Sequence, residues 1–98
     1  MSRLQRPAPL PRGWGGYLPQ PADYYQARIK GLGAPGSGGI AQAPCPLHAD
    51  DGTSLSVNLF TGHWHCLHCG RGVLIGFHQR LTGLDWTDAV RDLIKGRA

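Results

Sequence analysis

The stretch of residues 53–59 alternates polar and apolar side chains, a pattern that is typical of a β-strand with one buried face. A turn that contains Gly62 follows, and residues 63–66 have the pattern of a returning strand. The apolar face of the first strand consists of Leu55, Val57 and Leu59. The pattern therefore predicts a β-hairpin in the middle of the chain.

Two short helices are predicted after the hairpin. Apolar residues at helical spacing indicate the first over residues 73–81, which Gly83 would end. The second, over residues 86–95, has Asp85 as a candidate N-cap and Gly96 as a candidate C-cap. Its apolar stripe consists of Trp86, Ala89, Val90, Leu93 and Ile94. We expect this stripe to pack against the hairpin, and the alternative is a surface that binds a partner.

The segments before the hairpin are rich in proline and glycine. Residues 1–21 are predicted to form a flexible basic tail. Residues 22–43 are predicted to hold a short helix over 23–30 and a Gly-rich loop with a short strand near 39–42. A compact domain is expected over residues 44–95.

The chain has 98 residues and a formal net charge of +4, and arginines outnumber lysines eight to two among its ten basic residues. Arginine can bind phosphate through two hydrogen bonds at once, so this composition favours a polyanionic partner, with nucleic acid as the first candidate. The alternative is that the charge only keeps a small protein soluble. No stretch is long and apolar enough to span a membrane, and no signal peptide is recognisable, so we expect a cytoplasmic protein with no membrane partner.

All three cysteines belong to two ligand pairs, Cys45-Pro-Leu-His48 and Cys66-Leu-His-Cys69. The two intervening residues let one tight turn place both side chains of a pair on the same side of a metal ion. The alternative is buried thiols, or one disulfide and a spare thiol, which a cytoplasmic location disfavours. We predict one structural Zn²⁺ bound by Cys45, His48, Cys66 and Cys69, and we expect its binding to be part of folding.

Three further histidines leave the identity of the histidine ligand open. His63 and His65 should point away from the strand face that carries Cys66. His68 lies inside the second turn, where intervening side chains normally project outward. His48 is favoured because its spacing mirrors that of the second pair. A site with four protein ligands has no open position for water or substrate, so a catalytic zinc is not expected.

These elements predict a small α+β zinc ribbon. Its centre is a zinc-stapled β-hairpin, followed by two short C-terminal helices and preceded by the flexible Pro/Gly-rich N-terminus. A domain of this size has marginal stability without a staple, and the metal supplies one.

Several motifs in the second half of the chain match a known family. They are Cys45-Pro46-Leu47-His48, Asp50, Ser54-Leu55-Ser56-Val57, Trp64-His65-Cys66, Cys69-Gly70, Phe77 and Gly83-Leu84-Asp85-Trp86-Thr87-Asp88-Ala89-Val90. With them the chain resembles the zinc-binding domain of bacterial-type DNA primases, and more closely the small primase-like zinc-finger proteins of plasmids and integrative elements. It departs from the family at Leu47 and Leu55, where Phe is usual, at Thr53, where Pro is usual, and after Gly72, where an aspartate commonly precedes the helix.

The resemblance implies a domain that binds single-stranded template DNA beside a separate catalytic domain. The six acidic residues show no arrangement that would hold the two Mg²⁺ ions of nucleotidyl transfer, so we do not expect an enzyme. We expect a non-catalytic module that binds single-stranded DNA in the replication of a mobile element or phage. The expected DNA contacts are Trp64, His63, Arg71 and Arg80. The alternative role of Trp64 is a hydrophobic cover over the zinc site.

The alternative function is a protein-interaction adaptor that docks on a primase core, helicase or relaxase encoded separately. Its features are the amphipathic last helix and the proline-rich tail, which can bind a partner as an extended segment. Transcriptional regulators built on the same ribbon, and a purely structural zinc domain, are further alternatives.

Overall fold

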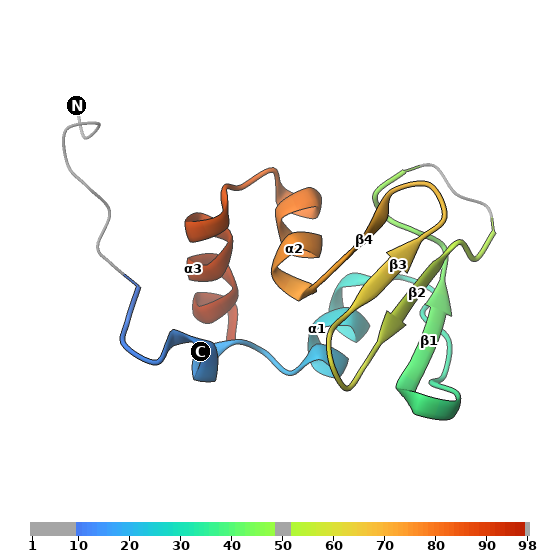
Figure 1. Ribbon diagram of the computed structural model, residues 1–98, viewed down its shortest axis with the longest axis horizontal. Coiled ribbons are helices and arrows are strands. Elements are labelled where there is room, and N and C mark those ends of the chain that lie inside the picture. Colours follow the sequence, from blue (N-terminus) through green and yellow to red (C-terminus); the bar gives the residue numbers. More distant parts are fainter. Residues whose placement is uncertain (1–9, 49–51, 98) are drawn as a thin grey trace.

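The computed structural model describes residues 10–48 and 52–97 (Figure 1). Its elements, in chain order, are a 3₁₀ helix Trp14–Tyr17, α1 Pro21–Arg28, a 3₁₀ helix Ser37–Gly39, β1 Ile40–Ala43, β2 Leu55–Asn58, β3 Trp64–Cys66, β4 Gly70–Gly72, α2 Leu74–Thr82 and α3 Trp86–Arg97. The strands form one antiparallel sheet in the order β1-β2-β3-β4. This is the small α+β class that the sequence predicted. Residues 1–9 of the expected tail, and Asp50 of the family motif, lie outside the described residues.

The predicted hairpin is confirmed as the pair β2–β3. Leu55 lies opposite Cys66, so the apolar face of β2 continues into the strand that carries a zinc ligand. The turn between the strands is closed by Asn58, whose Oδ1 accepts hydrogen bonds from the backbone N–H groups of Phe60 (2.8 Å) and Thr61 (3.1 Å). An asparagine that bonds the backbone two residues onward is a common device for a tight turn.

The outer strands match the prediction only in part. The short strand expected near residues 39–42 is β1. The strand β4 was not predicted, because Gly70-Arg71-Gly72 has a low intrinsic preference for strands and reads as a loop. It is a strand because it pairs with β3, where Gly72 lies opposite Trp64. A Cβ atom at Gly72 would lie 3.2 Å from Nε1 of Trp64, so glycine allows the indole to lie this close.

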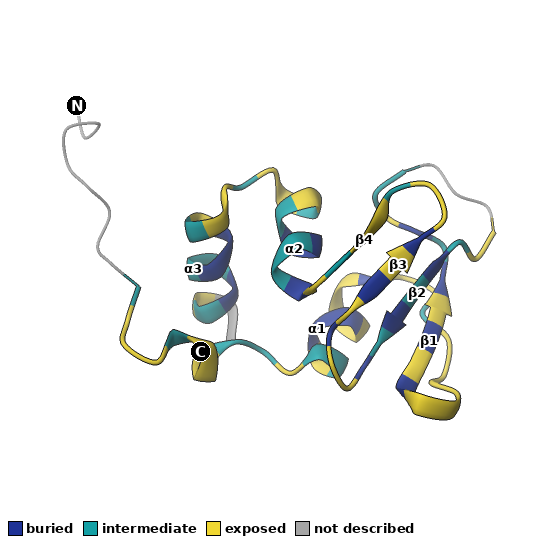
Figure 2. Ribbon diagram, in the orientation of Figure 1, coloured by how far each residue is buried: buried dark blue, intermediate teal, exposed yellow. Residues whose placement is uncertain are grey.

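The hydrophobic core lies between one face of the sheet and the helices α1 and α2 (Figure 2). Tyr25 of α1 and Phe77 of α2 are both fully buried, and their rings meet edge to face with centroids 5.3 Å apart. Trp64 of β3 contacts Phe77 in the same way at 5.5 Å. Because α1 supplies core residues, the compact part of the chain begins well before residue 44, where the sequence placed its start.

The last helix packs by its apolar stripe, as expected, but mainly against α2 instead of the hairpin (Figure 1). Ala89, Val90 and Leu93 of the stripe are buried. Trp86 stays 44% exposed and meets Trp14 edge to face at 5.3 Å. Part of the predicted flexible tail is therefore a 3₁₀ helix that rests on α3.

The helix ends follow local signals at two of the three predicted positions. The Asp85 N-cap is confirmed, since its Oδ1 accepts a hydrogen bond from the backbone N–H of Asp88 at 2.8 Å. Gly83 ends α2 in the left-handed conformation with φ 79°. Gly96 does not act as a cap, because α3 continues to Arg97.

A buried chain of hydrogen bonds joins the three α-helices. His78 of α2 has no exposed surface. Its Nδ1 lies 2.7 Å from the hydroxyl of Tyr24 in α1, and its Nε2 lies 2.6 Å from Oδ2 of Asp92 in α3. The network satisfies both ring nitrogens of a fully buried imidazole, which would otherwise cost stability.

Candidate metal centre and nucleic-acid interface

The four predicted zinc ligands meet at one end of the sheet. Cys45 and His48 follow β1, Cys66 ends β3, and Cys69 directly precedes β4. Their ligand atoms all lie within 4.8 Å of one another, with 4.0 Å between the sulfurs of Cys45 and Cys69 and 3.3 Å between Nε2 of His48 and Sγ of Cys66. A tetrahedral zinc with Zn–S bonds of about 2.3 Å requires sulfurs about 3.8 Å apart. The residues are therefore positioned to bind one zinc ion.

The surroundings of the three thiols differ. Burial would raise the pKa of Cys66, but hydrogen bonds from the backbone of His68, from His48, from the backbone of Cys69 and from Ser54 outweigh it and lower the pKa to about 6. Burial raises the pKa of Cys45 to about 12 and also raises that of Cys69. Because zinc binds thiolates, its binding displaces the protons that burial holds on these two sulfurs.

The other histidines near the site lie outside the cluster. His63 and His65 are exposed, on the opposite face of β3 from the buried Cys66, as the strand alternation predicted. His68 is also exposed, and its ring meets that of His48 edge to face at 5.0 Å. His48 is therefore the histidine that the fold brings to the cysteines.

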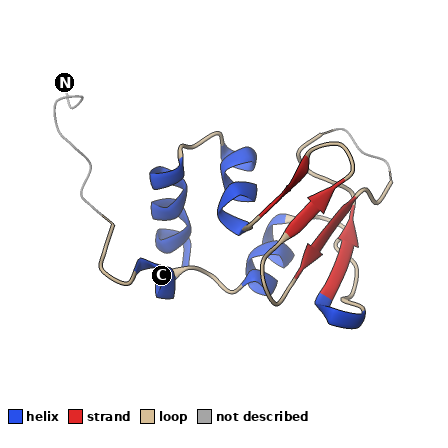
Figure 3. Cartoon of the chain, in the orientation of Figure 1, coloured by secondary structure: helices blue, strands red, loops and turns tan. Residues whose placement is uncertain are grey.

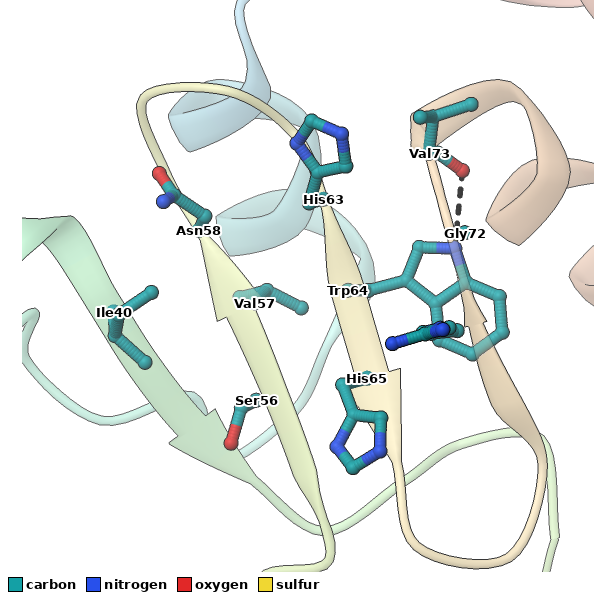
Figure 4. Close-up of a pocket in the computed structure, with 10 residues that line it drawn as sticks. Ile40, Ser56, Val57, Asn58, His63, Trp64, His65, Gly72 and Val73 are labelled. Atoms are coloured by element: carbon teal, nitrogen blue, oxygen red, sulfur yellow. Dashed lines mark hydrogen bonds between the residues drawn. The ribbon is translucent and has the colours of Figure 1, made fainter.

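The face of the sheet that points away from the core is polar and basic. Gln42, Ser56, His65 and Arg71 form one row across the four strands, because each lies opposite the next in the strand register. A hollow of about 590 Å³ opens on this face (Figure 4). It is lined by Ile40, Ser56, Val57, Asn58, His63, Trp64, His65, Arg71, Gly72 and Val73. This volume is within the range of sites for small organic groups, about 300–1,000 Å³.

Trp64 does not have the exposed ring that a DNA contact needs. It is only 3% exposed, its ring packs on Phe77, and its Nε1 donates a hydrogen bond to the Val73 carbonyl at 3.0 Å (Figure 4). The guanidinium of Arg80 lies over the indole at 5.1 Å from the ring centroid. Trp64 is therefore a core residue whose ring is covered by Arg80, and the proposed DNA contacts below are limited to the exposed candidates.

The three remaining candidate DNA contacts are all exposed, but they do not all lie at the hollow. His63 and Arg71 are exposed and line the hollow. Arg80 is exposed beside β4 and donates a hydrogen bond to the Cys69 carbonyl, so it links the metal-binding turn to α2. Sequence reasoning did not single out Ser56 and Asn58, although their alternation with buried Leu55 and Val57 places them on the outer face. The same alternation that predicted the core could have found them.

Fold and metal centre together define a small zinc-binding domain built on a four-stranded antiparallel sheet. Residues 36–97 match the family model described as the CHC2 zinc finger. The match spans more than half of the chain, which therefore belongs to the CHC2 zinc-finger family of primases. The family that the ligand motifs indicated is confirmed.

One sequence relative and one solved structure are similar to this chain. The chain is 38% identical over 60 residues to a DNA primase of Chlamydia pneumoniae, a match that covers 60% of this chain and 10% of that protein. The fold of this chain is similar to that in a crystal structure of the Aquifex aeolicus primase with its zinc-binding and RNA polymerase domains. The TM-score is 0.69 and the identity is 21%, and the match covers 86% of this chain and 21% of that one. The chain thus spans only a small part of either relative. Within the described residues, no helix has the length and apolar character needed to cross a membrane.

Proposed function

We propose that this domain is a non-catalytic module that binds single-stranded DNA during replication, in a mobile element or phage, beside a catalytic primase core. The observation that carries the proposal is the outer face of the sheet. Its hollow is lined by Arg71, His63 and His65, and none of the described residues that line it is acidic. A basic groove with no carboxylate favours a phosphate backbone.

The chemistry of the face fits an unpaired strand better than a duplex. Binding without strong sequence preference requires cationic groups along the backbone and apolar or flat surfaces for bases. Arg71 supplies a cation, the exposed Arg80 extends the basic surface beside β4, and Ile40 and Val73 are 41% and 50% exposed at the borders of the hollow. The relative from Chlamydia pneumoniae is a DNA primase, which supports a template-binding role here.

A non-catalytic role is supported by the arrangement of acidic residues. Throughout the described part of the chain, the zinc cluster is the one group of three or more His, Cys, Asp or Glu side chains close enough to share a metal ion. Asp23 lies on α1, and Asp88 and Asp92 lie on α3. Nucleotidyl transfer requires two metal ions about 3.5–4 Å apart between shared ligands. We therefore propose that catalysis is supplied by a separate domain.

The experiment is fluorescence anisotropy of a labelled single-stranded oligonucleotide titrated with zinc-loaded protein across a salt series. We expect Arg71→Ala to weaken binding and to reduce the slope of log affinity against log salt by about 0.7, the value for one phosphate contact on a single strand. Lys95→Ala removes the same charge from an exposed position on α3 and is the matched control, for which we expect the wild-type slope. Equal slopes for the two variants would contradict the proposed phosphate contact.

The adaptor function has one structural observation in its favour. Most of the apolar stripe of α3 is packed against the rest of the protein, but Trp86 of this stripe is 44% exposed. Its ring meets Trp14 of the 3₁₀ helix, which also holds the half-exposed Tyr17. Aromatic side chains are enriched where proteins bind each other. The test is a pull-down without DNA. This function is favoured if the wild-type protein retrieves a replication enzyme and the Trp86→Ala variant does not.

A further inference from the structure

The side-chain amide of Asn58 has a fixed orientation. Its Oδ1 accepts hydrogen bonds from two backbone N–H groups, those of Phe60 at 2.8 Å and Thr61 at 3.1 Å. Backbone N–H groups can only donate, so the atom that faces them is the carbonyl oxygen and the amide cannot be flipped. The free end of Asn58 is therefore its NH₂ group, which can only donate.

Asn58 lines the hollow on the outer face of the sheet (Figure 4). Asn58 alternates with the buried Val57 and lies opposite Ile40 of β1, so its side chain is on the outer face. Within the described residues, the hydrogen bonds of the Asn58 side chain are the two that its Oδ1 accepts. The half-buried side chain thus presents a fixed donor to whatever occupies the hollow.

We propose that the hollow holds one unstacked pyrimidine of the bound strand with position 4 of its ring facing Asn58, and that Asn58 selects the base by donating a hydrogen bond from Nδ2. This inference rests on the proposed function. Unpaired bases are commonly read by hydrogen bonds to their exposed edges. At position 4, thymine carries the acceptor O4 and cytosine carries the donor N4–H₂. In this orientation the fixed N–H donor binds O4 of thymine and faces a second donor in cytosine, so the site prefers thymine over cytosine.

The test compares the affinity of the zinc-loaded protein for oligothymidylate, oligodeoxyuridylate and oligodeoxycytidylate of equal length, by anisotropy at one low salt concentration. We expect thymine to bind about two- to tenfold more tightly than cytosine, the size of effect that one hydrogen bond produces. Deoxyuridine should bind like thymine, because both carry O4 and they differ only in the methyl group. Equal affinity for thymine and cytosine, or a preference for thymine that deoxyuridine does not share, would overturn the inference.

The decisive variant is Asn58→Asp. Aspartate can keep the turn, because one carboxylate oxygen replaces Oδ1, while the other oxygen replaces the donor by an acceptor. We expect the ratio of thymine to cytosine affinity to fall to one or below. Gln42→Glu is the control, since it adds the same charge to the same face of the sheet, on β1.

The control variant should weaken binding of all three oligonucleotides and leave their ratio as in the wild type. A thymine preference that persists in Asn58→Asp, or that Gln42→Glu abolishes equally, would overturn the role of Asn58 while the proposed function stands. Binding of none of the oligonucleotides by folded wild-type protein would overturn the proposed function and this inference together.

Discussion

Tyr24→Phe tests the buried hydrogen-bond chain that joins the three α-helices. The carboxylate of Asp92 can only accept, so Nε2 of His78 donates to it, and the hydroxyl of Tyr24 is the partner of Nδ1. Burial raises the pKa of Tyr24, which keeps its hydroxyl protonated. The variant removes one oxygen atom and leaves Nδ1 without a partner in a side chain with no exposed surface. An unsatisfied buried polar group costs about 1–3 kcal/mol, so we expect a loss of about 2 kcal/mol.

The assay is unfolding by urea and by heat in the presence of saturating zinc, followed by circular dichroism. For a domain of this size, a loss of about 2 kcal/mol lowers the melting temperature by roughly 8–16 °C. Tyr17→Phe is the matched control, since Tyr17 is 52% exposed and its change should alter stability by less than about 0.5 kcal/mol. If both variants unfold like the wild type, the buried hydrogen-bond network does not contribute about 2 kcal/mol to the free energy of unfolding.

Three further predictions concern the turns and the metal. Gly39→Ala should destabilise the protein by about 1–3 kcal/mol, because its φ is +79° and the new Cβ would lie 2.8 Å from the Phe60 ring. Gly38 also has a positive φ, but a Cβ there would meet no atom within 4 Å, so Gly38→Ala is the control. Equal urea midpoints for the two variants would refute the contribution of the clash with Phe60. His48→Ala should sharply weaken zinc affinity in a chelator competition and His68→Ala should not, and the reverse result would identify His68 as the ligand. Removal of zinc with a chelator should abolish the cooperative thermal transition, and an unchanged melting curve would show that folding does not depend on the metal.

The ligand pairs and the hairpin could be predicted because their signals are local. The two residues between the members of each pair determine how a turn presents them to a metal, whatever surrounds the turn. Alternation along residues 53–59 specifies which side chains share a face, and alternation along residues 63–66 placed His63 and His65 away from the zinc. The Asp85 cap and the Gly83 helix end have equally local causes.

Features that depend on contacts between separate elements could not be predicted from the sequence. The strand β4 exists through its pairing with β3, and the residues Gly70-Arg71-Gly72 show no strand preference of their own. The contribution of α1 to the core depends on contacts between Tyr25 and residues of α2, more than 50 positions later. The sequence left two roles open for Trp64, and only the tertiary structure shows that its ring is buried against Phe77.

The amino-acid sequence by itself determined the zinc ligands, the family and the faces of the central hairpin, because spacing and alternation act over a few residues. The tertiary structure alone decided that Arg71 joins the outer face of the sheet. Arg71 lies opposite His65, which lies opposite Ser56, through the register of β2, β3 and β4. This register arises from hydrogen bonds between separate strands, so it becomes visible only in the folded sheet.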